Sequence, residues 1–78
     1  MSLSYAETQY QIEIWDLAEK GIDTCRRRED LTHKMRYERI AEKARWSLHA
    51  VRNQPGCEWI EKDLAVRGLL DPKVNGAA

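Results

Sequence analysis

Residues that break helices are scarce in this sequence, which has only two prolines and four glycines among 78 residues. Residues 31–53 contain neither, so nothing in that stretch would interrupt a helix. Alanine, leucine, glutamate, lysine and arginine are frequent, and all five favour helices over sheet. We therefore predict an all-α fold.

Cysteine and histidine are also rare, since only Cys25, Cys57, His33 and His49 are present. Structural zinc sites mostly draw ligand pairs from turns about two to four residues apart, whereas His33 and His49 would lie about 24 Å apart along one helix. The two cysteines would be about 30 Å apart, and a disulfide requires roughly 4–7 Å. We expect no metal site, no intrachain disulfide and no cofactor.

Long apolar runs are missing as well. None approaches the roughly 20 residues that a membrane span requires. Residues 1–10 have neither the basic start nor the apolar stretch of a signal peptide. We therefore expect a cytoplasmic protein without a membrane partner. The length is sufficient for one domain, residues 1–78, and we expect its ends, residues 1–3 and 71–78, to be frayed.

A capping-box pattern opens the first predicted helix, since Glu7 follows Ser4 by three residues. We predict that this helix runs from about Ser4 to Arg28, although Gly21 offers an alternative, earlier end. At about 100° per residue, one apolar stripe follows the helix. It consists of Ala6, Tyr10, Ile14, Leu17, Gly21 and Cys25. Beside it lies a shoulder of Trp15, Ala18 and Ile22.

The second predicted helix, from about Asp30 to Asn53, has an apolar stripe of its own. The stripe consists of His33, Tyr37, Ile40, Ala41, Ala44, Leu48 and Val51. A helix of roughly 23 residues is about 35 Å long, close to the length of the first, which predicts an antiparallel helical hairpin. Met35 and Trp46 point the other way, so a third helix covers them or they contact a partner.

A short third helix is predicted from about Pro55 to Gly68, because proline is favoured at the first helical position. Its apolar residues are Trp59, Ile60, Leu64 and Val66. One such helix cannot cover the wide apolar faces of the hairpin. We therefore predict homodimerisation into a four-helix-like assembly.

Charge is unevenly distributed although it sums to zero. Residues 1–25 hold five acidic residues against one lysine, a net charge of −4, and residues 26–52 hold nine basic residues against four acidic ones, +5. An acidic segment followed by a basic one is typical of two helices packed together. The same basic segment is also suited to binding nucleic acid.

The sequence contains no nucleophile, base and orienting group that could converge, and no glycine-rich phosphate loop, so we do not expect an enzyme. We predict a small helical module that binds a larger protein and modulates or inhibits it, similar in general build to small accessory regulators of phages and bacteria. Large side chains carry most interface energy. The candidate contact residues are Tyr5, Trp15, Met35, Trp46 and Trp59. For at least one tryptophan we expect core packing instead.

Residues 37–56, YERIAEKARWSLHAVRNQPG, favour an alternative function. Ile40 and Ala41 match the core positions of a first helix. Trp46 matches the apolar residue that follows the turn, and Val51 matches the residue of a recognition helix that points into the core. In these residues the segment resembles the helix-turn-helix unit of DNA-binding transcriptional regulators, although an arginine stands where that turn usually has glycine. The resemblance implies a nucleic-acid partner and contacts to DNA from Arg45, Ser47, His49 and Arg52.

Overall fold

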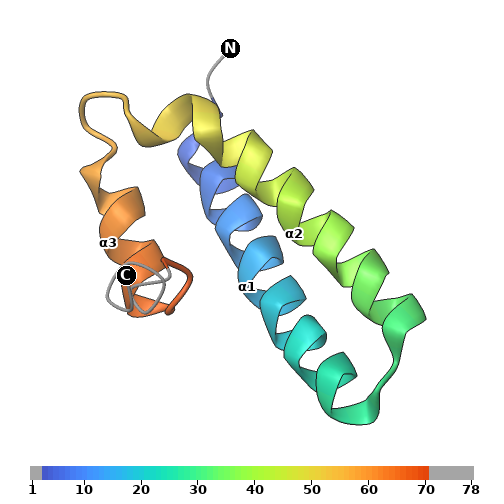
Figure 1. The fold of residues 1–78 in the computed structure, drawn as a ribbon. Coiled ribbons are helices and arrows are strands. Elements are labelled where there is room, and N and C mark those ends of the chain that lie inside the picture. Colours follow the sequence, from blue (N-terminus) through green and yellow to red (C-terminus); the bar gives the residue numbers. More distant parts are fainter. Residues whose placement is uncertain (1–2, 71–78) are drawn as a thin grey trace.

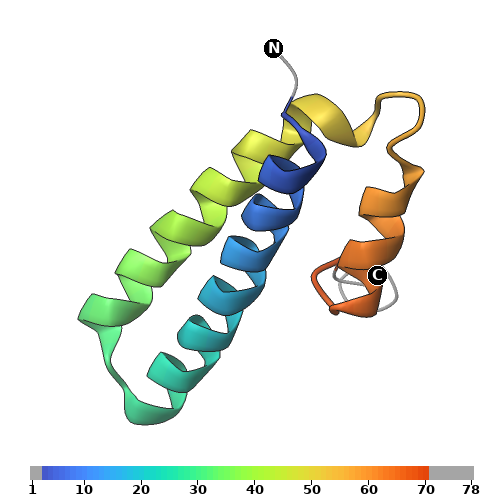
Figure 2. The ribbon, with the colours of Figure 1, turned by 180° about the vertical axis from the view of Figure 1, so that it is seen from behind.

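The computed structural model describes residues 3–70, which form three helices. Helix α1 spans Tyr5–Arg28, α2 spans Leu31–Arg52 and α3 spans Glu58–Val66. The two long helices lie antiparallel and side by side, and α3 lies beside the half of the hairpin in which α1 begins (Figures 1 and 2). The predicted all-α hairpin with a short third helix is therefore confirmed. Within the described residues, no helix combines the length and apolar content needed to cross a membrane.

Helix α1 begins with the capping box that the sequence predicts. The hydroxyl of Ser4 accepts a hydrogen bond from the backbone N–H of Glu7 at 3.1 Å, and the Glu7 carboxylate accepts one from the backbone N–H of Ser4 at 3.2 Å. The helix continues through Gly21 and ends at Arg28, as predicted. The next residue, Glu29, adopts the left-handed conformation (φ 57°), which terminates the helix.

Helix α2 is one unbroken helix, which confirms the predicted long second helix. Asp30 caps it, because its carboxylate accepts a hydrogen bond from the backbone N–H of His33 at 3.1 Å. A helix-turn-helix unit would require a break near Arg45, but residues 37–52 are all helical. The inference of that motif is therefore wrong. The apolar period continues across the supposed turn, and no glycine or proline favours a bend there.

Helix α3 is shorter than the predicted span of residues 55–68. Pro55 does not occupy a first helical position, because Gly56 follows it with φ 84°, a conformation incompatible with a right-handed helix. The helix starts only at Glu58, and Gly68, with φ 76°, follows its end.

The predicted frayed ends lie mostly outside the described residues, which exclude residues 1–2 and 71–78. Leu3 is described, and it packs half-buried against the core.

The core lies where the three helices meet. Its fully buried large side chains are Ile12, Leu48, Val51, Ile60 and Leu64. Several buried residues of the two long helices are small, namely Ala18, Ala41 and Ala44, as expected for closely approaching axes. The thiols of Cys25, which is buried, and Cys57, which is half-buried, are both free.

The buried face of α1 differs from the predicted stripe. Tyr10 and Leu17 belong to that stripe but are 66 % and 61 % exposed. The buried residues are instead the predicted shoulder with its neighbours, namely Thr8, Ile12, Trp15, Asp16, Ala18, Ile22 and Cys25. The reason is the position of α3, which packs on the flank of α1 marked by Ile12 and Asp16 and shifts the buried arc toward itself.

The predicted stripe of α2 is only half correct. Its C-terminal part, Ala41, Ala44, Leu48 and Val51, is buried. His33, Tyr37 and Ile40 are exposed, and they lie in the half of the hairpin nearest the α1–α2 turn, along which α3 does not extend. That half is therefore only two helices thick.

At Gly21 the two long helices make a notably close contact. A Cβ atom placed on Gly21 would lie 2.8 Å from three atoms of the Tyr37 ring, closer than carbon atoms can pack. Glycine is therefore required here for space, and its φ is that of an ordinary helical residue.

Replacing Gly21 by alanine should lower the free energy of unfolding by about 1 kcal/mol, because displacement of the Tyr37 ring outweighs the better helix propensity of alanine. In a Tyr37→Ala background the same replacement should instead raise the unfolding free energy by about 0.5–1 kcal/mol, since only the propensity gain remains. Urea unfolding of the four proteins of this double-mutant cycle measures both values. Equal effects in both backgrounds would contradict the packing argument.

Candidate functional site

The outer face of α2 carries the most exposed tryptophan of the chain. Trp46 is 69 % exposed and Met35 is 61 % exposed. They are eleven residues apart, close to three full turns, so both side chains leave the helix on the same side. As the sequence predicts, this side faces away from α1. Helix α3 does not fold over it either, because α3 packs against the N-terminal half of α1 and the C-terminal end of α2.

Charged and polar groups surround Trp46. Its indole ring meets the imidazole of His49 edge-on, with the ring centroids 5.8 Å apart. A shallow hollow of about 360 Å³ beside it is lined by Glu42, Arg45, Trp46, His49 and Arg52. We call Met35, Trp46 and His49 the Trp46 face. An apolar centre with a charged rim is the usual arrangement of a protein-binding surface.

A second exposed apolar surface lies on the other side of the hairpin from α3. We call it the hairpin face, and it consists of Tyr10, Leu17, Tyr37 and Ile40. On the helical wheel, Leu17 and Tyr10 point about 100° and 120° away from Asp16, the residue that contacts α3. Residues of both α1 and α2 contribute to this face, so it covers the seam between the two helices.

The other three predicted contact residues, Trp15, Tyr5 and Trp59, lie outside both exposed faces. Trp15 is only 5 % exposed and belongs to the core, as we expected for at least one tryptophan, so its ring does not form part of the exposed surface. Its indole N–H donates to the Glu19 carboxylate at 3.1 Å. Tyr5 remains exposed but contacts Trp59 in a tilted arrangement, with ring centroids 4.8 Å apart and the ring planes at 51°. Trp59 is half-buried against the core. Both rings therefore help to attach α3, and their role toward a partner stays a prediction.

The residues implied in DNA binding are mostly engaged within the chain. Arg45 lies 3.7 Å from the Glu19 carboxylate, and its guanidinium stands over the Trp15 ring at 5.8 Å. The hydroxyl of Ser47 donates to the backbone carbonyl of Lys43 at 3.1 Å. His49 contacts the Trp46 ring. The structure brings these residues onto one continuous helix and not onto a separate recognition helix.

Arg52 is engaged most firmly of these residues. Its guanidinium donates two hydrogen bonds to the Glu61 carboxylate, at 2.6 and 3.1 Å, and so connects α2 to α3. These bonds favour the charged form and hold the pKa of Glu61 below its ordinary value. This ion pair therefore contributes to α3 docking above the ordinary glutamate pKa and is lost as the pH falls through the lowered value.

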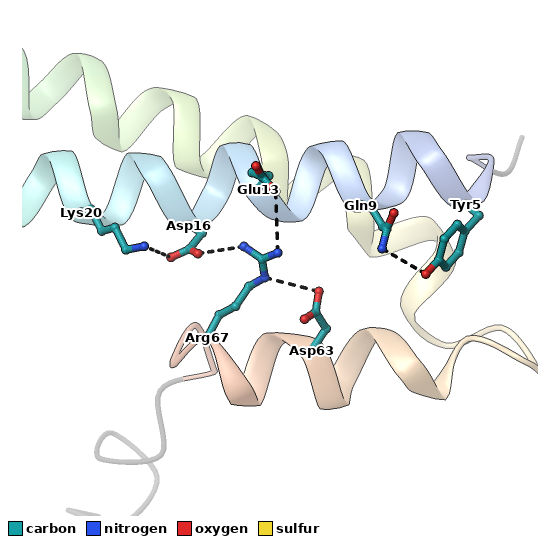
Figure 3. Close-up of polar contacts among 7 residues, drawn as sticks. All are labelled: Tyr5, Gln9, Glu13, Asp16, Lys20, Asp63 and Arg67. Atoms are coloured by element: carbon teal, nitrogen blue, oxygen red, sulfur yellow. Dashed lines mark hydrogen bonds and ion pairs between the residues drawn. The ribbon is translucent and has the colours of Figure 1, made fainter.

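A second polar cluster, centred on Arg67, connects the end of α3 to α1 (Figure 3). The Arg67 guanidinium lies 2.8 Å from a carboxylate oxygen of Asp16, 3.4 Å from one of Asp63 and 3.7 Å from one of Glu13. Lys20 approaches the other oxygen of Asp16 at 3.6 Å. Asp16 is buried, so Arg67 supplies the charge that a buried carboxylate requires.

The cleft beside this cluster holds no unpaired reactive group. It measures about 460 Å³ and lies between the hairpin and the end of α3. Its charged side chains are all paired, Asp16 with Arg67 and Lys20, Glu19 with Arg45, and Asp23 with Arg27 outside the cleft. Across residues 3–70, no three histidine, cysteine or acidic side chains come together as a cation site. The candidate functional surfaces are therefore the Trp46 face and the hairpin face.

Comparisons with known proteins find no family model that matches this chain, and no curated protein or solved structure with significant similarity to it. The two exposed surfaces are therefore the basis for inferring function.

Proposed function

We propose that this chain is a small, non-enzymatic helical module that binds a larger protein through the Trp46 face and thereby modulates or inhibits it. The exposure of Trp46, at 69 %, is the observation that carries the proposal. A large apolar ring at the surface of a highly charged helix is out of contact with the core and leaves apolar area in water. Tryptophan is also enriched among the residues that dominate binding energies.

The surroundings of Trp46 fit such a contact. Met35 adds a flexible apolar side chain on the same side of the helix, and methionine adapts to partners of different shapes. Glu42, Arg45 and Arg52 line the hollow beside Trp46 and would remain at the rim of an interface, where charge favours the correct partner and orientation. Because α2 is a continuous helix, the face is rigid and loses little entropy on binding.

Replacing Trp46 by alanine should weaken partner binding by at least about 30-fold, as expected for a central aromatic anchor. The partner is first captured from the native cell and named by mass spectrometry, and its affinity for purified variants is then measured by calorimetry. Val66→Ala, at an even more exposed apolar position on α3, serves as the control and should bind like the wild type. Unchanged affinity of both Trp46→Ala and Met35→Ala would refute the proposal.

Nucleic acid is the rival partner, and a fluorescence titration with mixed duplex DNA at two salt concentrations separates the two. Binding through basic side chains releases counterions and falls steeply with salt. Our proposal expects at most weak binding at low salt, because Arg45 and Arg52, two of the residues implied in DNA contact, already pair with carboxylates of the chain. Tight, salt-dependent binding would support the rival.

Homodimerisation is the second part of the proposal, and it concerns the hairpin face. Tyr10 and Leu17 are exposed on a flank that α3 leaves free. A two-helix hairpin with one open face gains stability when a second hairpin covers that face to complete a four-helix arrangement.

A further inference from the structure

The two edges of the hairpin face differ in charge. On the α2 edge, Arg36 lies about one turn before Ile40 along the helix and Lys43 about one turn after it. Neither forms an ion pair with another of the described residues. On the α1 edge, Glu7 and Glu13 lie about 60° to either side of Tyr10 on the helical wheel. Both are exposed, although Glu7 also belongs to the capping box and Glu13 lies 3.7 Å from Arg67. The hairpin face therefore has acidic residues along its α1 edge, basic residues along its α2 edge and apolar residues between them.

We infer that a second copy of this chain covers the hairpin face with its helices interchanged, so that α1 of each copy packs antiparallel against α2 of the other. The inference rests on the homodimer part of the proposed function and specifies its geometry. A two-fold axis parallel to the helices produces this pairing, and the same pair of contacts is then made twice.

The level of each residue along the hairpin fixes which side chains meet. Gly21 lies beside Tyr37, so Leu17, one turn away on α1, is level with Ala41 on α2, and Glu13 is level with Arg45. A rotation about an axis parallel to the helices keeps these levels. Leu17 of one copy therefore faces Ile40 of the second copy, and Glu13 comes within about one turn of Lys43.

The alternative two-fold axis, perpendicular to the helices, would place α1 against α1 and α2 against α2. If this axis passes through Leu17 and Ile40, Arg36 of one copy lies near Lys43 of the other. The two α1 helices then face one another, and each belongs to residues 1–25, which have a net charge of −4. Like charges facing one another destabilise an interface and suppress that arrangement. Charge complementarity therefore selects the interchanged pairing.

Site-directed cross-linking of the full chain distinguishes the two arrangements. In a Cys57→Ser background, which leaves only the buried thiol of Cys25, one chain receives Leu17→Cys and a differently tagged chain receives Ile40→Cys. Mixed and oxidised, the two should form the cross-tag disulfide, and each alone should give little dimer. Efficient cross-linking of the Leu17→Cys chain with itself would overturn the inference, as would a strictly monomeric 9.1 kDa species in sedimentation at about 100 µM.

A charge-reversal pair provides an independent measurement. Lys43→Glu and Glu13→Lys should each raise the dimer dissociation constant by about tenfold, and the double variant should restore it, because an attractive pair forms again at both symmetric contacts. Lys43 is exposed and outside the ion pairs of the described residues, whereas Glu13 is exposed but lies 3.7 Å from Arg67. Circular dichroism and urea unfolding therefore verify that α3 stays docked in both variants that carry Glu13→Lys. Failure of the double variant to restore dimerisation would contradict the inferred register.

The dimer and the proposed partner site can fail separately. Leu17→Glu should raise the dimer dissociation constant by about 100-fold, since each dimer loses two apolar contacts of about 1.4 kcal/mol. Leu31→Glu, at a similarly exposed leucine outside the hairpin face, should leave it unchanged. Trp46→Ala should weaken binding to the larger protein and leave the dimer intact. If Trp46→Ala leaves binding to the larger protein unchanged while Leu17→Glu weakens the dimer as expected, only the partner-binding part of the proposed function is refuted.

Discussion

Replacing Leu48 by alanine is expected to lower the free energy of unfolding by about 3 kcal/mol, a large loss for a single substitution. Leu48 is completely buried in the core, where α2 meets Ile60 and Leu64 of α3 and Ile12 of α1. Removing three carbon atoms costs their transfer free energy and also leaves a cavity that three packed helices cannot easily close.

For a domain of 78 residues this loss is a large share of the total, which is expected to be about 4–12 kcal/mol. Urea unfolding followed by circular dichroism measures it. Leu31→Ala is the matched control, because the same atoms are removed from a leucine that is mostly exposed, and its effect should stay within about 0.5 kcal/mol. Similar losses for both variants would mean that Leu48 does not lie in the three-helix core.

Replacing Arg67 by methionine should cost about 2 kcal/mol, between the values for exposed and fully buried ion pairs. The aliphatic part of the side chain is kept, but Asp16, whose side chain is only 12 % exposed, loses its closest cationic partner. The uncompensated carboxylate then favours opening of the contact between α3 and α1. Hydrogen exchange should show faster exchange across α3, with α1 and α2 less affected.

Two further variants test the cause of this loss. Arg27→Met removes an arginine from a pair with Asp23 in which both side chains are 66 % exposed, and it should cost less than about 0.5 kcal/mol. Adding Asp16→Asn to Arg67→Met should recover about 1 kcal/mol, because the buried charge is removed as well. If Asp16→Asn gives no recovery, Arg67 acts by packing and not by neutralising Asp16.

Local signals in the sequence were sufficient to predict the two long helices. The capping box at Ser4 and Glu7 and the stretch of residues 31–53 without glycine or proline act over a few residues, and both are realised. The predicted start of α3 was wrong because proline at position 55 has two meanings, a helix start or a turn. The left-handed conformation of Gly56 decides in favour of the turn.

The buried side of α1 could not be predicted, because it depends on contacts distant in sequence. A helical wheel ranks faces by apolar content, which favours Tyr10 and Leu17. The face that is buried includes Asp16, which pairs with Arg67, fifty-one residues further along the chain. Periodicity alone contains no information on such a pair. The helical wheel correctly placed Trp46 on the outer side of α2. It could not show which tryptophan joins the core, because the contacts that bury Trp15 come from distant parts of the chain.

The two-residue connection between α1 and α2, Glu29 and Asp30, also sets the order in which the molecule assembles. Closing so short a loop costs little entropy, and the contacts it allows are close in sequence, so the hairpin is expected to form early. Helix α3, with nine residues and a loop containing Gly56, has no comparable local nucleus and docks onto a preformed surface. Its docking is therefore the last and most easily reversed step of folding.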